Sequence, residues 1–180
     1  RAAPGAIVKV LRADGSECGI EEDGELLVRA AATMKRYLKN PEMTDASLSD
    51  GLFRTGDLVK QDANGFFYIT GRIKEIIIRG GANISPSEVE KALIAHPGVQ
   101  DAAVIGVADR IFGEVPIAIV VRRHGSDVSQ EELIAHVETL LSDFKVPRTI
   151  FFEAELPQGK TGKTDKKQLK ERFEPLLKAS

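Results

Sequence analysis

The sequence has few of the residues that disulfides, metal centres and nucleophilic active sites need. Its 180 residues include one cysteine, Cys18, three histidines and no tryptophan. A lone thiol excludes an internal disulfide and a cysteine-based zinc site. The histidines His96, His124 and His136 are scattered, and none accompanies a serine or cysteine nucleophile pattern. We therefore expect no protein-bound metal site, no hydrolytic triad and a reducing, cytoplasmic location.

Excess charge of one sign and long apolar runs are also lacking. The chain has 25 Lys and Arg against 27 Asp and Glu, a net charge of -2, which disfavours a dedicated nucleic-acid binder. Apolar runs such as Val115–Val121 are far shorter than the roughly 18 residues that a membrane span needs, so we expect no transmembrane segment. The 42% hydrophobic content is enough for a packed core.

The first part of the chain carries strand and turn signals. Runs of β-prone residues at Ile7–Arg12 and Leu26–Val28 end or begin at Asp-Gly turns. Two further runs flank Asp62–Gly65, and an Asn-Gly pair between such runs predicts a β-hairpin. We expect Met34–Asn40 to form a short helical turn that ends at Pro41. These signals predict an antiparallel β module.

After Gly71 the pattern becomes an alternation of strands and helices. Capping boxes at Ser85–Glu88 and Ser129–Glu132 predict two helix starts, and a basic amphipathic helix is expected from Asp165. With the apolar runs between them, the expected order is β-α-β-β-α-β-α. The predicted fold class is α+β, with an antiparallel, β-barrel-like module at residues 1–72 followed by a small α+β domain at residues 73–180.

Three segments could carry chemistry, and each also has an ordinary structural interpretation. The glycine- and lysine-rich loop Gly159–Lys163 suits phosphate or carboxylate oxygens, although it lacks the spacing of a Walker P-loop. Gly80-Gly81 could cradle an anion at a helix N-terminus, or be a tight turn. Asp57 could accept hydrogen bonds from a ribose diol, or stabilise its own turn. Spacing alone favours the structural interpretation of all three segments.

The order of several short stretches changes this interpretation. Together, over nearly the whole chain, they resemble the adenylate-forming superfamily, which comprises acyl-CoA synthetases, firefly luciferase and the adenylation domains of peptide synthetases. The stretches that carry the resemblance are Tyr37 with Asn40–Thr44, Asp50–Leu58, Gly65–Tyr68, Thr70–Glu75, Gly80–Glu90, His96–Val99, and Leu156-Pro157 with Thr161–Lys163.

The resemblance implies a two-step reaction and a role for five residues. ATP, with Mg²⁺, and a carboxylic acid form an acyl-adenylate, after which the small domain rotates and the thiol of CoA displaces AMP. By resemblance, Asp57 binds the ribose hydroxyls and Arg72 helps to hold the nucleotide. Lys74 stands at the hinge, and Gly81 lies in the loop that lines the pantetheine tunnel. Lys163 is the catalytic lysine that bridges the carboxylate and the α-phosphate.

The resemblance also implies that this chain is a piece of a longer enzyme. It begins at Arg1 rather than Met, and it has neither the phosphate loop that ends in Pro-Lys-Gly nor the Tyr-Gly-x-Thr-Glu adenine segment of the family. Residues 1–72 correspond to the β-barrel end of the large N-terminal AMP-binding domain, and residues 73–180 to the mobile C-terminal domain. We expect the missing N-terminal subdomains to be its partner, and the 180-residue chain alone to be inactive.

The Arg79–Pro86 stretch looks most like that of fatty-acid and related acyl-CoA ligases. An adenylation module that delivers to a carrier protein is the alternative enzyme. A non-enzymatic anion- or nucleic-acid-binding module is the other alternative, although the net charge and the lack of interleaved aromatic residues weigh against it. It would use the basic residues near the C-terminus, namely Lys160, Lys163, Lys166, Lys167, Lys170 and Arg172.

Overall fold

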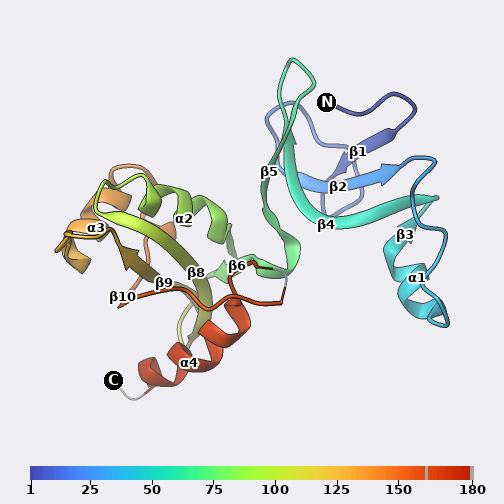
Figure 1. The fold of residues 1–180 in the computed structure, drawn as a ribbon. Helices are drawn as coiled ribbons and strands as arrows, with labels where there is room; N and C mark the ends of the chain where they lie inside the picture. The colour runs from blue at the N-terminus through green and yellow to red at the C-terminus, as the bar shows by residue number, and fades with distance from the viewer. Residues whose placement is uncertain (161, 179–180) are drawn as a thin grey trace. The chain divides into compact units, whose positions relative to one another are not determined.

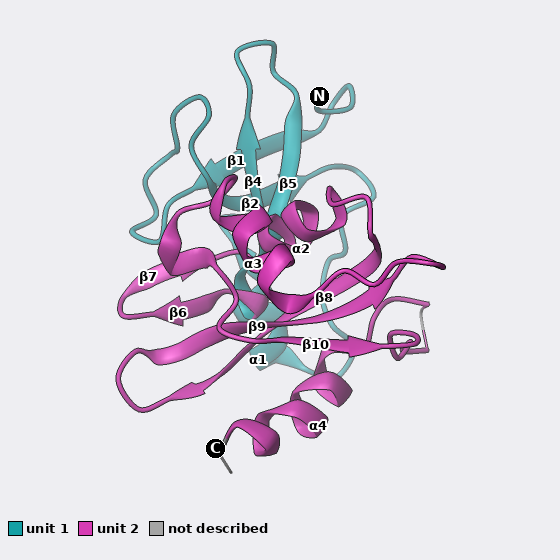
Figure 2. Ribbon diagram, turned by 90° about the vertical axis from the view of Figure 1, so that its left-hand side faces the viewer, with its two compact units in different colours: residues 1–74 teal, residues 75–180 magenta. Residues whose placement is uncertain are grey.

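A computed structural model describes residues 1–160 and 162–178 of the chain. The chain forms two compact units, Arg1–Lys74 and Glu75–Ser180, which Figure 2 shows in different colours. Each unit contains its own five-stranded sheet. The expected α+β class is confirmed, because the first unit is mainly antiparallel sheet and the second combines a sheet with helices (Figure 1).

The first unit is built on an open antiparallel sheet. Strand β2 pairs with one edge of β4, whereas β3 and β5 share the other edge, and β1 lies outside β2. No pairing joins β1 to β5 within this fully described unit, so the expected barrel-like module is not a closed barrel. Its elements are β1 (Ile7–Leu11), β2 (Gly24–Arg29), α1 (Pro41–Ser47), β3 (Leu48–Ser49), β4 (Leu52–Gln61) and β5 (Phe67–Arg72).

The predicted hairpin joins β4 to β5, and its turn is held by backbone hydrogen bonds and by the Asp62 carboxylate. Asp62 Oδ1 accepts hydrogen bonds from the backbone N–H groups of Asn64 (2.9 Å) and Phe66 (2.8 Å). The Phe66 bond is the largest of the interactions that hold the pKa of Asp62 below its usual value. Gly65 adopts φ +78°, a conformation that glycine reaches without a Cβ clash. This turn sets the pairing of Val59–Gln61 with β5, and a register shift between Leu58 and Val59 then brings Asp57 opposite Arg72.

The expected helical turn at Met34–Asn40 is wrong. The helix begins at Pro41, where Asn40 is the N-cap and its side-chain oxygen accepts a hydrogen bond from Met43 N at 3.0 Å. Proline is favoured at the first helical position, because its missing N–H would have no intrahelical partner there and its φ already suits a helix. Pro41 therefore starts a helix instead of ending one.

The second unit is a sheet with helices on both faces. Strands β8 and β9 form a long antiparallel hairpin, β10 runs parallel to β9, and β6 connects β9 to β7. Its elements are β6 (Ile77–Arg79), β7 (Ala82–Ile84), α2 (Pro86–Ile94), β8 (Val99–Asp109), β9 (Gly113–Arg122), α3 (Gln130–Glu138), β10 (Ile150–Glu153) and α4 (Lys166–Lys178), with 3-10 turns at Asp143–Lys145 (η2) and, at the unit border, Ile73–Glu75 (η1). The expected order is confirmed apart from β7, which the sequence analysis did not predict.

Alternate side chains of the central hairpin point into two separate cores, as the two-residue period of a strand requires. Ala118 and Val120 of β9 pack with α2 and α3 through residues such as Leu93 and Leu133. Ile117, Ile119 and Val121 instead pack against α4 through Leu169 and Phe173. Helices α2 and α3 thus cover one face of the sheet and α4 covers the other (Figure 1).

One of the two predicted capping boxes forms. Ser129 Oγ accepts from Glu132 N at 3.2 Å, and Glu132 Oε2 accepts from Ser129 N at 2.8 Å, so both halves of the box are present. At the other site Ser85 is the N-cap of α2, but its side chain makes no capping hydrogen bond. The carboxylate of Glu88 instead binds Lys145 of η2, with both oxygens 2.7 Å from Nζ. An ion pair from a distant segment therefore replaces the local bond.

Candidate functional site

In the first unit the structure brings Asp57 and Arg72 together. They are ladder partners on β4 and β5, and Arg72 Nε lies 2.9 Å from Asp57 Oδ1. The turn before Asp57 is shaped by Gly56, at φ +71°, and by Thr55, whose hydroxyl oxygen accepts from Asp57 N at 3.0 Å. The Arg72 side chain is 55% exposed, and this pair presents a carboxylate and a guanidinium side by side. Such a pair can accept from hydroxyl groups and donate to phosphate oxygens.

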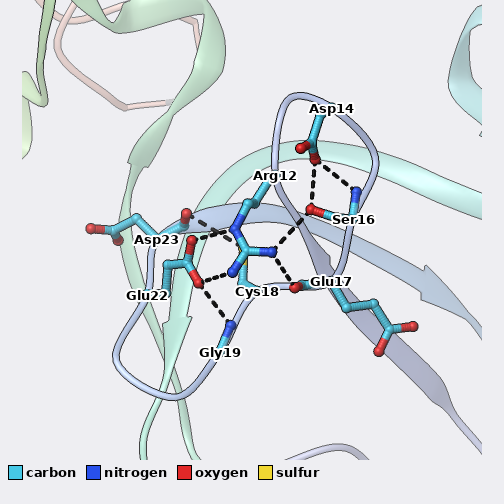
Figure 3. Close-up of polar contacts among 8 residues, drawn as sticks. All are labelled: Arg12, Asp14, Ser16, Glu17, Cys18, Gly19, Glu22 and Asp23. Atoms are coloured by element: carbon cyan, nitrogen blue, oxygen red, sulfur yellow. Dashed lines mark hydrogen bonds and ion pairs between the residues drawn. The ribbon is translucent and has the colours of Figure 1, made fainter.

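The only cysteine of the chain does not form a reactive centre. Cys18 lies in the β1–β2 loop, where its Sγ is 3.6 Å from the carbonyl oxygen of Asp23. Burial, followed by the negative charge of Glu22, raises the pKa of the Cys18 thiol. Figure 3 shows that Arg12 holds this loop together, with its guanidinium bound to Glu22, Ser16 and a backbone carbonyl. The cluster is an internal brace, and its thiol stays protonated at neutral pH.

Lys74 lies at the border of the two units. It is in the 3-10 turn Ile73–Glu75, its side chain is exposed, and the chain divides into compact units directly after it. The turn carries no buried residue. Its hinge role, and the assignment of residues 1–72 and 73–180 to two AMP-binding domains, remain predictions.

Gly80 and Gly81 form the tip of the β6–β7 hairpin. Arg79 pairs with Ala82, so the two glycines are the whole loop, and their φ angles of +57° and +87° suit a type I′ turn. Strand β7 separates the two glycines from α2. The interpretation as an anion site at a helix N-terminus is therefore wrong, and the interpretation as a tight turn is correct. A Cβ on Gly81 would meet no atom within 4 Å, so this side of the tip is open.

Lys163 lies in a small loop that is closed by backbone hydrogen bonds. Gly159 N donates to Lys163 O at 2.8 Å, and Gln158 pairs with Thr164. The Lys163 side chain is exposed, and its ammonium group has no ion-pair or hydrogen-bond partner in the described part of the chain. Thr161, which belongs to the same stretch, lies outside the described residues. The loop therefore presents an unneutralised cation on a constrained backbone.

The loop is attached directly to the start of α4. Asp165 N donates to Pro157 O at 2.8 Å, and Asp165 Oδ1 accepts from Gln168 N at 3.1 Å, which caps the helix. Because α4 buries Leu169 and Phe173 against the sheet, the loop is fastened to the core of the second unit. The helix thus restricts the positions that the Lys163 side chain can occupy relative to the second unit.

Most of the other C-terminal cations are neutralised within the unit. Lys166 binds two carboxylates, which the sequence analysis missed. The remaining pairs are Lys167–Glu171 (3.7 Å), Lys170–Glu114 (3.6 Å) and Arg172–Glu153 (2.7 Å). These pairs weaken the case for a polyanion-binding surface, which needs cations free to replace the counterions of a nucleic acid.

A hollow of about 460 Å³ borders the base of the Lys163 loop, where Leu156, Gln158 and Thr164 form part of its wall. Two carboxylates, Asp101 and Glu155, also line it. Their negative charge disfavours a phosphate in this hollow. Within residues 1–160 and 162–178, no group of three or more His, Cys, Asp and Glu side chains is arranged to hold a metal ion. In the same residues no helix has both the length and the apolar character needed to cross a bilayer.

Comparison with known proteins defines the class of the chain. Residues 88–163 match the family model of the AMP-binding enzyme C-terminal domain. Over 97% of its length the chain superposes on 35% of the ATP-bound MatB of Rhodopseudomonas palustris, with a TM-score of 0.91 and 35% identity. Residues 88–163 are thus an AMP-binding enzyme C-terminal domain, and the chain is similar over nearly its whole length to an adenylate-forming enzyme, as its motifs indicate.

The curated relatives that the chain resembles include CoA ligases. The chain is similar to the sulfoacetate–CoA ligase of Cupriavidus necator, with 42% identity over 92% of this chain and 33% of the relative. It is also similar to the feruloyl-CoA synthase of an Amycolatopsis species, with 43% identity over 84% of this chain and 31% of the relative. The chain thus spans about a third of the length of the curated relatives that it matches.

Proposed function

We propose that the chain is the C-terminal part of an AMP-forming ligase that activates a carboxylic acid as acyl-adenylate and transfers it to CoA. The observation that carries the proposal is the exposed ammonium of Lys163, which has no ion-pair or hydrogen-bond partner among residues 1–160 and 162–178. It lies on a loop fastened to α4, within the fold of an adenylate-forming enzyme. The names of the relatives, which are CoA ligases for sulfoacetate and ferulate, support CoA as the acceptor. A cytoplasmic location is part of the same proposal.

The chemistry of adenylation explains why such a lysine is needed. A carboxylate attacks the α-phosphate of ATP, so two negatively charged groups must approach each other and charge accumulates on the phosphate oxygens. An ammonium held between them offsets the repulsion and stabilises this charge. The constrained backbone of the loop limits the orientations of Lys163, which favours in-line geometry. Asp57 and Arg72 hold the ribose hydroxyls and the phosphate side of the nucleotide.

Mg²⁺ accompanies ATP in this proposal. Mg²⁺ is commonly held by substrate phosphates and one or two carboxylates, and therefore needs no dedicated protein cage. The lack of a three-ligand cluster in the described residues is compatible with that mode. ATP, the acid and CoA are then the substrates, and the upstream subdomains form most of their binding sites.

The second half-reaction uses a different face of the second unit. Rotation about Lys74 removes Lys163 after the adenylate has formed and brings the Gly80-Gly81 tip to the reaction centre. The open space beside Gly81 then admits the pantetheine arm of CoA. Domain motion of this kind lets one active site perform two reactions in sequence.

Product analysis of the longer protein tests the proposal. The polypeptide with its upstream subdomains is incubated with ATP, Mg²⁺, CoA and a panel of carboxylic acids that includes sulfoacetate and ferulate. We expect AMP, pyrophosphate and an acyl-CoA in equal amounts, and no reaction with the 180-residue chain alone. Formation of ADP, or acyl-adenylate made by the 180-residue chain, would contradict the proposal. Transfer to a phosphopantetheinyl carrier protein but not to CoA would favour the alternative adenylation module.

A further inference from the structure

The first turn of α4 contains a cation that its helix does not favour. Lys166 is the first residue of α4, where the helix dipole carries a positive partial charge and acidic side chains are preferred. Its side chain is only 25% exposed, so burial also disfavours the charged form. Burial alone would lower the pKa of Lys166, but the carboxylates of Glu90 and Glu75 outweigh it and raise that pKa. An energetic reason for a lysine here must therefore come from these two partners.

The two partners belong to different segments of the second unit. Lys166 Nζ lies 2.9 Å from Oε2 of Glu75 and 2.8 Å from Oε1 of Glu90. Glu75 directly follows Lys74, the proposed hinge. Glu90 is on α2, and its Oε1 also accepts from the backbone N–H of Val104 on β8 at 2.8 Å. Glu90 is thus fixed to the sheet, and Lys166 ties the residue after the hinge to it.

Lys166 is also linked to the Lys163 loop. Its backbone N–H donates to Thr164 O at 3.2 Å, and the preceding residue, Asp165, is bound to Pro157 on the other side of the loop. One residue therefore connects the segment after the hinge, helix α2 and the end of the loop that carries the proposed catalytic lysine. We refer to Lys166, Glu75 and Glu90 as the Lys166 clamp.

We propose that Lys166 is a positioning residue whose clamp fastens Glu75 and the base of the Lys163 loop to α2. Domain rotation is then confined to the backbone of Lys74, and it carries Lys163 as part of a rigid body. The inference rests on the proposed function. Without the ammonium, two carboxylates would remain within about 6 Å of each other, where like charges repel. They would separate, and both the segment after the hinge and the loop would gain freedom.

The clamp itself is tested in the 180-residue chain. Lys166→Met keeps the length and apolar stem of the side chain but removes its charge, Lys166→Arg keeps the charge, and Lys91→Met is the control because it removes an exposed cation next to Glu90. We expect amide hydrogen exchange of residues 73–79 and 162–169 to become at least about tenfold faster in Lys166→Met only. Unchanged exchange in both segments would overturn the clamp.

The positioning role is tested in the longer enzyme by separating the half-reactions. For Lys166→Met we expect kcat for acyl-adenylate formation to fall about tenfold, with KM for ATP nearly unchanged, since a displaced catalytic group slows chemistry more than binding. Thioester formation from supplied acyl-adenylate should change less than about twofold, because Lys163 does not act in that step. Lys166→Arg should restore adenylation.

The outcomes separate this inference from the proposed function. If the wild-type longer enzyme forms no acyl-adenylate from any acid of the panel, the proposed function fails, and hydrogen exchange still decides whether the clamp exists. If the wild type is active and Lys166→Met slows both half-reactions equally, or neither, the positioning role is overturned. A loss that Lys166→Arg does not restore would also overturn it, because the role requires only the positive charge.

Discussion

Substitutions of Gly81 test two properties of the β6–β7 tip separately. One is the positive φ that its backbone adopts, and the other is the open space around it. The residue has φ +87°, a conformation that costs an L-amino acid about 1–2 kcal/mol relative to glycine. A Cβ there would touch nothing within 4 Å, so no steric term is added. Gly81→Ala should therefore lower the free energy of unfolding by about 1–2 kcal/mol. In a unit of this size, that is a fall in melting temperature of about 5 °C for each kcal/mol.

The matched variant Gly81→Leu has the same backbone penalty and a much larger side chain. Because the tip is open, we expect its unfolding free energy to lie within about 0.5 kcal/mol of that of Gly81→Ala. In the longer enzyme the two variants should differ strongly in thioester formation from supplied acyl-adenylate, since only the leucine obstructs the thiol path. Chemical denaturation of both variants measures the first effect, and single-turnover thioester formation measures the second. A leucine variant much less stable than the alanine variant would refute the open tip, and equal thioester rates would refute the tunnel role.

Three further predictions address the hinge, the core and the pH dependence. Lys74→Pro in the longer enzyme should slow one half-reaction selectively, because proline fixes φ near -65° and so restricts rotation there; equal loss of both would count against the hinge. Leu93→Ala, at a fully buried position of α2, should destabilise the second unit by about 3 kcal/mol in urea unfolding, and a change below about 1 kcal/mol would contradict its place in the core. The backbone N–H of Ser129, then its hydroxyl, lowers the pKa of Glu132, so this carboxylate contributes stability above its usual pKa that is lost as the pH falls through its lowered pKa. Glu132→Gln keeps an acceptor but cannot titrate, so its melting temperature should fall less than that of the wild type between about pH 5 and pH 3, and parallel curves would refute the assignment.

The features that could be predicted from the sequence are those with local causes. The Asp62–Gly65 hairpin and the Ser129 capping box form because their hydrogen bonds join residues two to four positions apart. The alternation of β9 into two cores likewise follows from the period of a strand. Pro41 was misinterpreted even though its cause is local, because proline both ends helices and begins them, and the side chain of Asn40 decides between the two.

The features that could not be predicted depend on distant residues. Glu88 binds Lys145, 57 positions away, instead of its expected capping partner, and Lys166 binds Glu75, 91 positions away. The pairing of Asp57 with Arg72 depends on the register of β4 and β5, which shifts by one residue between Leu58 and Val59. One signal for the Lys166 clamp was present, namely a lysine at a helix start, where the dipole favours an acid.

In the proposed function, Lys163 acts in adenylation and not in thioester formation. The most direct measurement compares the two half-reactions of Lys163→Ala in the longer enzyme. Exchange of labelled pyrophosphate into ATP reports the first, and acyl-CoA formation from supplied acyl-adenylate reports the second. The ammonium of Lys163 is exposed and has no partner in the part of the chain that the structure describes, which predicts a loss of exchange of at least about a hundredfold, with thioester formation nearly unchanged. Pyrophosphate exchange at the wild-type rate would contradict this role of Lys163.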